Sequence, residues 1–175
     1  MSLPNREIKV EENLHYVKFD ETSYVLANSG LTDWTQSANP NTEDGVQYIA
    51  EKTAHSTMLG YAPNVAYSGF AYPSDTFNLW LYKVGKEETV GAVFDEVEVE
   101  TWNPVAEKDG EYNAYHRIYE VQPSNPGSGS GGGKLAIEGT FAQQGSVERG
   151  TFNITTKTFT KEGEVAPASL KAGAK

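Results

Sequence analysis

The sequence predicts a mainly β protein built from antiparallel strands, with one α-helix. Short runs rich in Tyr, Val, Thr and Phe alternate with clusters of Gly, Pro, Asn, Ser and Asp, the pattern of strands separated by turns. The 175 residues are 38% hydrophobic and include 7 Phe, 3 Trp and 10 Tyr, so the chain can bury a core. Only one segment carries the period of a helix. These observations exclude a wholly disordered chain and favour one domain of ordinary size.

The strand predictions follow the aromatic and β-branched runs along the chain, because such residues suit a pleated, half-buried surface. Turn-forming residues separate most of these runs from one another. The predicted strands cover residues 14–20, 23–27, 31–37, 46–51, 56–60, 64–72, 89–102, 112–122, 134–143, 146–153 and 155–160.

The helix prediction covers residues 74–85. Its apolar positions recur at i, i+3, i+4 and i+7, which places them on one face of a helix. Ser74 or Asp75 can cap the first amides, and Gly85 is expected just after the last helical residue. The apolar face consists of Phe77, Trp80, Leu81 and Val84.

The chain divides by composition into three parts. Residues 1–13 are charged and form a predicted N-terminal arm, residues 14–160 form the main β domain, and residues 161–175 form a C-terminal tail. Within the domain, the polar segment 39–52 has the composition of an element that becomes ordered on a partner. The Gly-rich segment 125–134 is expected to be a flexible hairpin loop, with an engineered linker as the alternative origin.

Few residue patterns in the chain indicate catalysis or a cofactor. The absence of cysteine excludes disulfides, thiolate nucleophiles and Cys-ligated metals, and His15, His55 and His116 are too widely separated for a metal motif. Residues 127–132 satisfy G-x-G-x-x-G, but a strand pattern follows them where a dinucleotide site needs a helix. We therefore expect no catalytic residue, no metal and no cofactor.

Charge and hydropathy limit the possible partners. The formal net charge of −10 argues against a nucleic-acid-binding surface, because phosphate backbones attract basic patches. The first residues lack a secretory signal, and no apolar run approaches the ~20 residues that span a bilayer. We expect a soluble protein made in a cytoplasm.

The segment DEVEVE is the most informative charged feature. In a strand, Glu96, Glu98 and Glu100 project from one face while Val97 and Val99 point to the other. A solvated face of a half-buried strand is the simplest interpretation. The alternatives are a catalytic carboxylate pair, a calcium site, or an acidic surface shared with other copies of the chain.

Several segments together resemble the tail tube (major tail) proteins of long, non-contractile-tailed bacteriophages, particularly those of Gram-positive hosts. The resemblance spans roughly residues 5–160 and rests on the order of the segments and the single helix. The segments are PNREIKVEENLHYVKF, YIAEKTAHSTMLGYAPNVAYSG, YPSDTFNLWLYKVGKEETVG and KLAIEGTFAQQGSVERGTFNITTKTFT.

This resemblance implies an antiparallel β-sandwich or flattened barrel with a flanking helix and a structural, non-enzymatic role. Subunits of this family form hexameric rings that stack into a hollow tube in the virion tail, assembled in the host bacterial cytoplasm. The implied partners are other copies of the chain, the tape-measure protein in the lumen, and the tail terminator and baseplate or distal tail proteins. Genomic DNA would pass through without specific binding, and no membrane is involved.

The resemblance also assigns two groups of residues. Residues 39–60 become the loop that contacts neighbouring subunits and rings. Glu96, Glu98 and Glu100 become a hypothetical lining of the lumen, where negative charge would keep DNA from adhering to the wall. The predicted interface residues are Asn39, Asn41, Glu43, Asp44, Val46, Tyr48, Glu51, Lys52, His55 and Met58.

Three other functions compete with the tail tube. A carbohydrate-binding β-sandwich would need exposed, coplanar Trp and Tyr side chains. A glycosidase on a β-sandwich would need carboxylates that converge across a cleft. A tube protein of a contractile tail or a secretion system would share the fold and the ring, so composition does not separate it from our main prediction.

Overall fold

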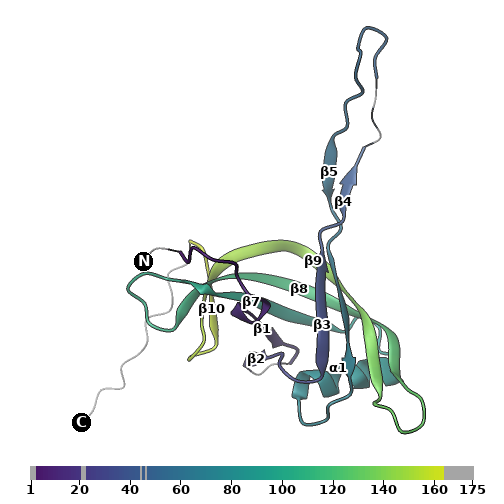
Figure 1. The fold of residues 1–175 in the computed structure, drawn as a ribbon, viewed down its shortest axis with the longest axis vertical. Helices are drawn as coiled ribbons and strands as arrows, with labels where there is room; N and C mark the ends of the chain where they lie inside the picture. The colour runs from purple at the N-terminus through teal and green to yellow at the C-terminus, as the bar shows by residue number, and fades with distance from the viewer. Residues whose placement is uncertain (1–2, 21–22, 44, 46, 164–175) are drawn as a thin grey trace. The chain divides into compact units, whose positions relative to one another are not determined.

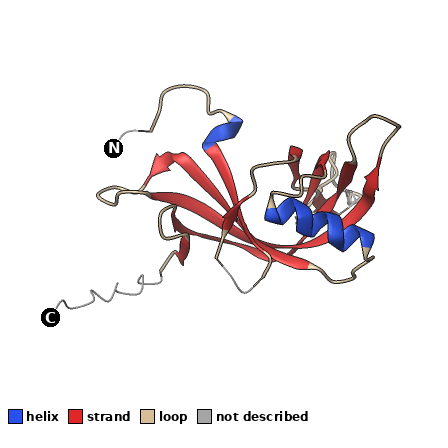
Figure 2. Ribbon diagram, turned by 90° about the horizontal axis from the view of Figure 1, so that it is seen from below, coloured by secondary structure: helices blue, strands red, loops and turns tan. Residues whose placement is uncertain are grey.

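The computed structural model describes residues 3–20, 23–43, 45 and 47–163. Within these ranges the chain is mainly antiparallel β-strand, and α1 (Thr76–Lys86) is the one α-helix. Figure 1 colours the chain from purple at its N-terminal end to yellow at its C-terminal end, and Figure 2 shows α1 and the short 3₁₀ helix η1 (Val10–Glu12) in blue. The predicted fold class, mainly β with one helix, is confirmed. No helix in these ranges is both long and apolar enough to cross a membrane.

Backbone contacts group the chain into two compact units. The first contains Met1–Leu26, Asp95–Arg117 and Ser146–Lys175, and the second contains Ala27–Phe94 and Ile118–Gly145. The long strands β7 (Val93–Pro104), β8 (Glu111–Ser128) and β9 (Ala136–Asn153) contribute residues to both. The division at residues 13 and 160 stays a prediction.

The first unit is built around β1, which pairs antiparallel with β2 on one side and β7 on the other. Tyr16 lies opposite Val97 in this register and packs with Val99, Ala114 and Phe152 in a buried core. On the far side of the unit, β10 pairs with β9. The element bounds are β1 (Asn13–Lys18), β2 (Val25–Leu26), β7 (Val93–Pro104), β8 (Glu111–Ser128), β9 (Ala136–Asn153) and β10 (Thr158–Lys161).

The second unit places β6 between β3 and β9, with α1 packed on the sheet. Phe141 of β9 is fully buried and stacks on Tyr67, with ring centroids 4.2 Å apart. The ring centroid of Phe77 in α1 lies 5.1 Å from that of Phe94 and 6.4 Å from that of Phe141. These aromatic contacts hold the helix on the sheet. The remaining bounds are β3 (Leu31–Ser37), β4 (Pro40–Thr42), β5 (Met58–Tyr61) and β6 (Asn64–Phe70).

The start of α1 is as predicted, and its end is not. Asp75 is the N-cap, because its Oδ1 accepts a hydrogen bond from the backbone amide of Asn78 at 2.9 Å. Gly85 was expected beyond the helix but lies inside it. A Cβ at Gly85 would lie 2.7 Å from Cβ of Pro126, so glycine is needed here for packing. Glu88 adopts the left-handed conformation instead, with φ of 52°.

Some predicted strands differ from those observed. Residues 47–51 form a turn in place of the predicted strand 46–51, and residue 46 lies outside the described residues. The predicted strands 134–143 and 146–153 are one continuous strand, β9, with Gly145 inside it at φ of 78°. The strand predicted at 155–160 begins only at Thr158, because the backbone amides of Thr155 and Thr156 donate hydrogen bonds to Asn153 Oδ1 and form a turn. The strand β4 lies at Pro40–Thr42, where the sequence predicts no strand.

The predicted hairpin loop 125–134 is found in part: residues 125–128 belong to β8, and residues 129–135 connect β8 to β9. The amide of Gly133 donates to the carbonyl oxygen of Ser130 at 2.9 Å, which closes a tight turn. A Cβ added at Gly131 or Gly132 would meet no atom within 4 Å, so the tip of the loop is open to solvent.

Candidate functional site

Strands β4 and β5 form a two-stranded sheet of their own, separate from the other strands of the second unit. Figure 1 draws them, with their connecting loop, beyond the ends of β3 and β6. Pro40 lies opposite Tyr61 and Thr42 opposite Met58 in the pairing register. We call residues 40–61 the arm.

Asn39 fixes the base of the arm. Its φ is 44°, a conformation that Asn adopts more readily than most residues with a side chain. Its side-chain amide donates to the carbonyl of Ala62 at 3.2 Å, and its own carbonyl accepts from the Ala62 amide at 3.0 Å. These two bonds hold the two chain segments together between the last β3–β6 pair, Ser37 and Asn64, and the first pair of the arm, Pro40 and Tyr61.

A turn at Tyr48–Glu51 forms the far part of the arm. The Glu51 amide donates to the Tyr48 carbonyl at 2.9 Å, and the Gln47 side-chain amide donates to the Glu51 carbonyl at 2.9 Å. The imidazole of His55 lies 3.6 Å from the Glu51 carboxylate. These contacts lie within the arm, so they shape it without attaching it to a core.

Large apolar side chains on the arm are exposed. Ile49 is fully exposed, Tyr48 is 67% exposed and Leu59 is 63% exposed. Met58 and Tyr61 are also exposed. The predicted interface residues include Tyr48 and Met58 but not Ile49, Leu59 or Tyr61. Their large apolar side chains, in or next to the segment 39–60 that was already assigned to the interface, are the signal that could have found them. A hairpin of two strands with exposed apolar groups is marginally stable alone, and it gains stability when a partner covers it.

The structure brings most of the predicted interface residues together on this one element. Asn39 lies at the base, Asn41 in β4 and Met58 in β5, and the rest of the described set lies in the connecting loop. That loop set is Glu43, Tyr48, Glu51, Lys52 and His55. Asp44 and Val46 lie outside the described residues. The interface assignment itself stays a prediction.

The three glutamates of DEVEVE share one face of β7, as the alternation predicts. Glu96 lies opposite Val17, Glu98 opposite His15 and Glu100 opposite Asn13 in the pairing with β1. All three side chains bind neighbours, but only Glu96 is buried, while Glu98 and Glu100 are partly exposed. The interpretation of a solvated face therefore fails at Glu96.

Glu96 and Glu98 form a cluster with His15 and Arg117. Glu96 is 1% exposed and its Oε1 lies 2.8 Å from His15 Nδ1. Arg117 Nη1 donates to Glu96 Oε2 at 3.3 Å and to Glu98 Oε2 at 2.8 Å. Glu100 accepts a hydrogen bond from Asn103 at 2.7 Å. The guanidinium compensates two carboxylates, and Glu96 presents almost no surface to solvent. The lumen-lining assignment of the three residues stays a prediction.

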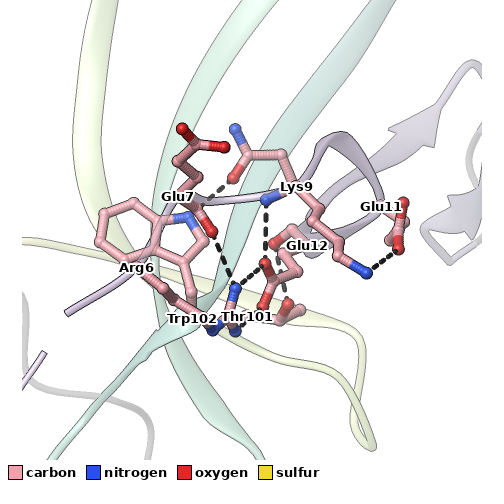
Figure 3. A network of polar contacts seen from close by, with 8 residues as sticks. Arg6, Glu7, Lys9, Glu11, Glu12, Thr101 and Trp102 are labelled. Atoms are coloured by element: carbon pink, nitrogen blue, oxygen red, sulfur yellow. Dashed lines mark hydrogen bonds and ion pairs between the residues drawn. The ribbon is translucent and has the colours of Figure 1, made fainter. Parts of the chain in front are cut away.

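A second polar network ties the start of the chain to β7 (Figure 3). The guanidinium of Arg6 binds both carboxylate oxygens of Glu12, which also accepts the Lys9 amide at 2.9 Å. These hydrogen bonds, chiefly those from Arg6, lower the pKa of Glu12 to about 2. Thr101 Oγ1 donates to the Glu12 carbonyl at 2.8 Å, and the Trp102 indole donates to Asn13 at 2.9 Å.

The described histidines do not converge on one site. His15 lies with Glu96, His55 lies in the arm, and His116 lies 3.5 Å from Asp95 and 3.4 Å from Glu148. Within the described ranges, no group of three or more His, Asp or Glu side chains is arranged to hold a metal ion.

The comparisons with known proteins concern the fold. No protein-family model matches the sequence, and no curated protein sequence matches it. The structure is similar to a chain in the tail of an empty gene transfer agent particle refined with C6 symmetry, with a TM-score of 0.49, 13% identity, and coverage of 81% of this chain and 97% of that one. It is also similar to a chain of the virion of a native gene transfer agent particle, with a TM-score of 0.48, 15% identity, and coverage of 88% and 99%.

Proposed function

We propose that this chain is a structural protein that associates with copies of itself through the arm, forming the stacked hexameric rings of a phage tail tube. The observation that carries the proposal is the arm, a hairpin without a core that exposes Tyr48, Ile49 and Leu59. Apolar side chains gathered on a projecting element favour burial against a partner. A head-to-tail contact of this kind closes into a ring when its rotation permits, and rings can then stack.

Charge supports the same role. Each subunit has a formal net charge of −10, so six copies would surround a lumen with negative potential. DNA passing through such a tube would be repelled from its wall. The tape-measure protein, the tail terminator and the baseplate or distal tail proteins are the further partners that this proposal includes, with assembly in the host cytoplasm.

The aromatic side chains give less support to a carbohydrate-binding module. The ring centroids of Trp34 and Phe141 lie 5.1 Å apart, and those of Trp80 and Phe77 lie 5.9 Å apart. Both indoles therefore belong to the aromatic cluster of the second unit. Trp102 donates its indole hydrogen to Asn13. A coplanar platform for stacking sugars would need indoles with open faces.

The test is association of the purified protein over a concentration series, followed by light scattering after size exclusion and by negative-stain electron microscopy. We expect rings or hollow tubes from the wild type. The double variant Ile49→Lys, Leu59→Lys should need at least about 10-fold more protein to associate, because it places two charges where apolar contact is required.

Val10→Lys with Val147→Lys is the matched control, since both valines are exposed and lie outside the arm. The control should associate like the wild type, and circular dichroism should show the same fold for all three proteins. Equal association of the arm variant and the control would refute the arm as the contact. A wild type that remains monomeric throughout, even with preformed tail initiator complexes added, would refute the tube.

A further inference from the structure

A groove of about 430 Å³ lies in the second unit where α1 ends. The end of the helix and the turn that follows it form one wall, and residues of β8 form the other. The amide of Val121 in β8 donates a hydrogen bond to the carbonyl oxygen of Ala92 at 2.8 Å, and Gly85 of α1 packs closely on Pro126 of β8. These contacts join the two walls, so the groove exists before any partner binds.

The groove offers apolar surface to a partner. Val90 at its rim is 94% exposed, and a Cβ added at Gly91 would meet no atom within 4 Å, so the groove is open on this side. Pro123 and Pro126 add apolar rings without amide donors. Two further pockets, both in the first unit, are lined mainly by polar and charged side chains. An apolar group therefore gains more from burial in the groove at the end of α1 than in either of them.

The tip of the arm, residues 48–52, carries apolar side chains that need such a surface. Ile49 is fully exposed and Tyr48 is 67% exposed, and the turn that holds them is closed by the hydrogen bond from the Glu51 amide to the Tyr48 carbonyl. In the single chain both Ile49 and Val90 are exposed, so the tip does not occupy the groove of its own chain. A second copy is needed to bring the two surfaces together.

Charge at the tip is complementary to that of the groove. Glu88 and Glu120 line the groove, and the C-terminal end of a helix is the negative end of its dipole. At the tip, the Glu51 carboxylate already faces the imidazole of His55 at 3.6 Å. Lys52, the next residue, is exposed and forms no ion pair with a described residue. Its ammonium group is therefore available to a carboxylate of the groove.

The remaining described acidic residue of the arm lies apart from the tip. Glu43 follows β4 directly, and its amide donates to the carbonyl of Thr57, next to β5, at 2.8 Å. The carboxylate of Glu43 therefore belongs to the part of the arm beside the two strands.

We propose that the groove at the end of α1 receives the tip of the arm from a second copy of the chain, with Ile49 on the apolar wall and Lys52 beside Glu88. This inference rests on the self-association proposed above and names the surface that binds the arm. Tip and groove are different surfaces, so the contact is head-to-tail. Contacts of this type close into rings or continue as open stacks.

The test is disulfide trapping between two full-length proteins, since the chain has no native cysteine. One protein carries Ala50→Cys at the tip, and the other carries Thr89→Cys in the groove together with a tag that changes its size. Both positions are exposed, and both substitutions leave Ile49 and Val90 in place. In the control pair, Thr156→Cys replaces Thr89→Cys, at an exposed threonine in the turn between β9 and β10.

In a glutathione redox buffer, we expect Ala50→Cys to form the mixed disulfide about 10-fold faster with Thr89→Cys than with Thr156→Cys. Binding of the tip raises the effective concentration of the two thiols in the first pair only. The tag identifies the mixed product by its size.

Charge reversal then tests the recognition. Lys52→Glu in the Ala50→Cys protein should lower the rate with Thr89→Cys about 5-fold at low salt, because it places like charges together. Glu88→Lys in the Thr89→Cys protein should restore most of that rate. Glu87→Lys is the matched control, since Glu87 is exposed and adjacent in sequence but does not line the groove. It should restore less than half as much.

Two results would overturn the inference. Equal rates of Ala50→Cys with Thr89→Cys and with Thr156→Cys would show that the tip has no preference for the groove. A faster reaction of Thr89→Cys with itself than with Ala50→Cys would identify a second groove as the occupant. Failure of self-association is a separate result, because it is decided by the light scattering and microscopy of the proteins without cysteine.

Discussion

Arg117 Nη1 lies 3.3 Å from Glu96 Oε2, and both side chains are removed from solvent, with 10% of Arg117 and 1% of Glu96 exposed. Glu98 shares the same guanidinium nitrogen at 2.8 Å, and His15 contacts the other oxygen of Glu96 at 2.8 Å. Burial of a carboxylate is costly unless charge and hydrogen bonds compensate it. Arg117 therefore permits the carboxylate of Glu96 to be buried beside that of Glu98.

Arg117→Met should destabilise the protein by about 3–5 kcal/mol, because it leaves two carboxylates without their guanidinium. Urea unfolding followed by circular dichroism measures the change. Arg149→Met is the matched control, since Arg149 is 62% exposed and lies 3.8 Å from Glu162. The control should change the free energy of unfolding by less than about 1 kcal/mol. Similar losses of free energy of unfolding in Arg117→Met and Arg149→Met would contradict the role given to Arg117.

Gly69→Ala should destabilise the second unit by about 1–3 kcal/mol through overpacking. A Cβ at Gly69 would lie 2.1 Å from the carbonyl oxygen of Gly30 and 2.7 Å from Cα of Leu31, and backbone atoms cannot move aside cheaply. Gly60→Ala is the control, because its Cβ would meet nothing within 4 Å. Thermal unfolding of the two variants compares them, and an unchanged melting temperature for Gly69→Ala would disprove the close approach.

Glu12→Gln should change how stability depends on pH. Arg6, with the Lys9 amide, lowers the pKa of Glu12 from 4.5 to about 2 in the folded chain. The carboxylate therefore contributes its full stability above pH 4.5 and loses it as the pH falls towards 2.

Wild type should melt higher than Glu12→Gln at pH 6–7, and the difference should narrow steadily below about pH 4.5. Glu11→Gln is the control, since Glu11 lies 3.6 Å from Lys9 in an exposed pair. Scanning calorimetry from pH 7 to pH 2.5 gives the curves. A difference that stays constant over this range would rule out a titrating Arg6–Glu12 contact.

Phe141→Ala should be among the most destabilising single substitutions in the second unit, at about 3–5 kcal/mol. Phe141 is fully buried and contacts Tyr67, Trp34 and Phe94. Phe141→Leu retains most of the volume of the buried side chain, so its loss in free energy of unfolding should be less than half that of Phe141→Ala. Guanidinium unfolding compares the two variants, and equal losses would indicate that the cavity is not the cause.

The sequence predicts the local features of this fold well because they depend on neighbouring residues. The period from Phe77 to Val84 and the capping by Asp75 locate α1, and alternation places the three glutamates on one face. Long-range partners are not contained in such patterns. Nothing near Glu96 in the sequence indicates that Arg117 of β8 reaches it. Gly85 was misplaced for the same reason, since Pro126 lies far along the chain.

The open tip of the β8–β9 loop has a practical consequence. Because Gly131 and Gly132 contact nothing that a side chain would displace, we expect an epitope, a fluorophore site or a folded reporter inserted between them to open the Ser130–Gly133 turn and leave both flanking strands intact. The loop is therefore a suitable labelling position for the association experiments that test the proposed function.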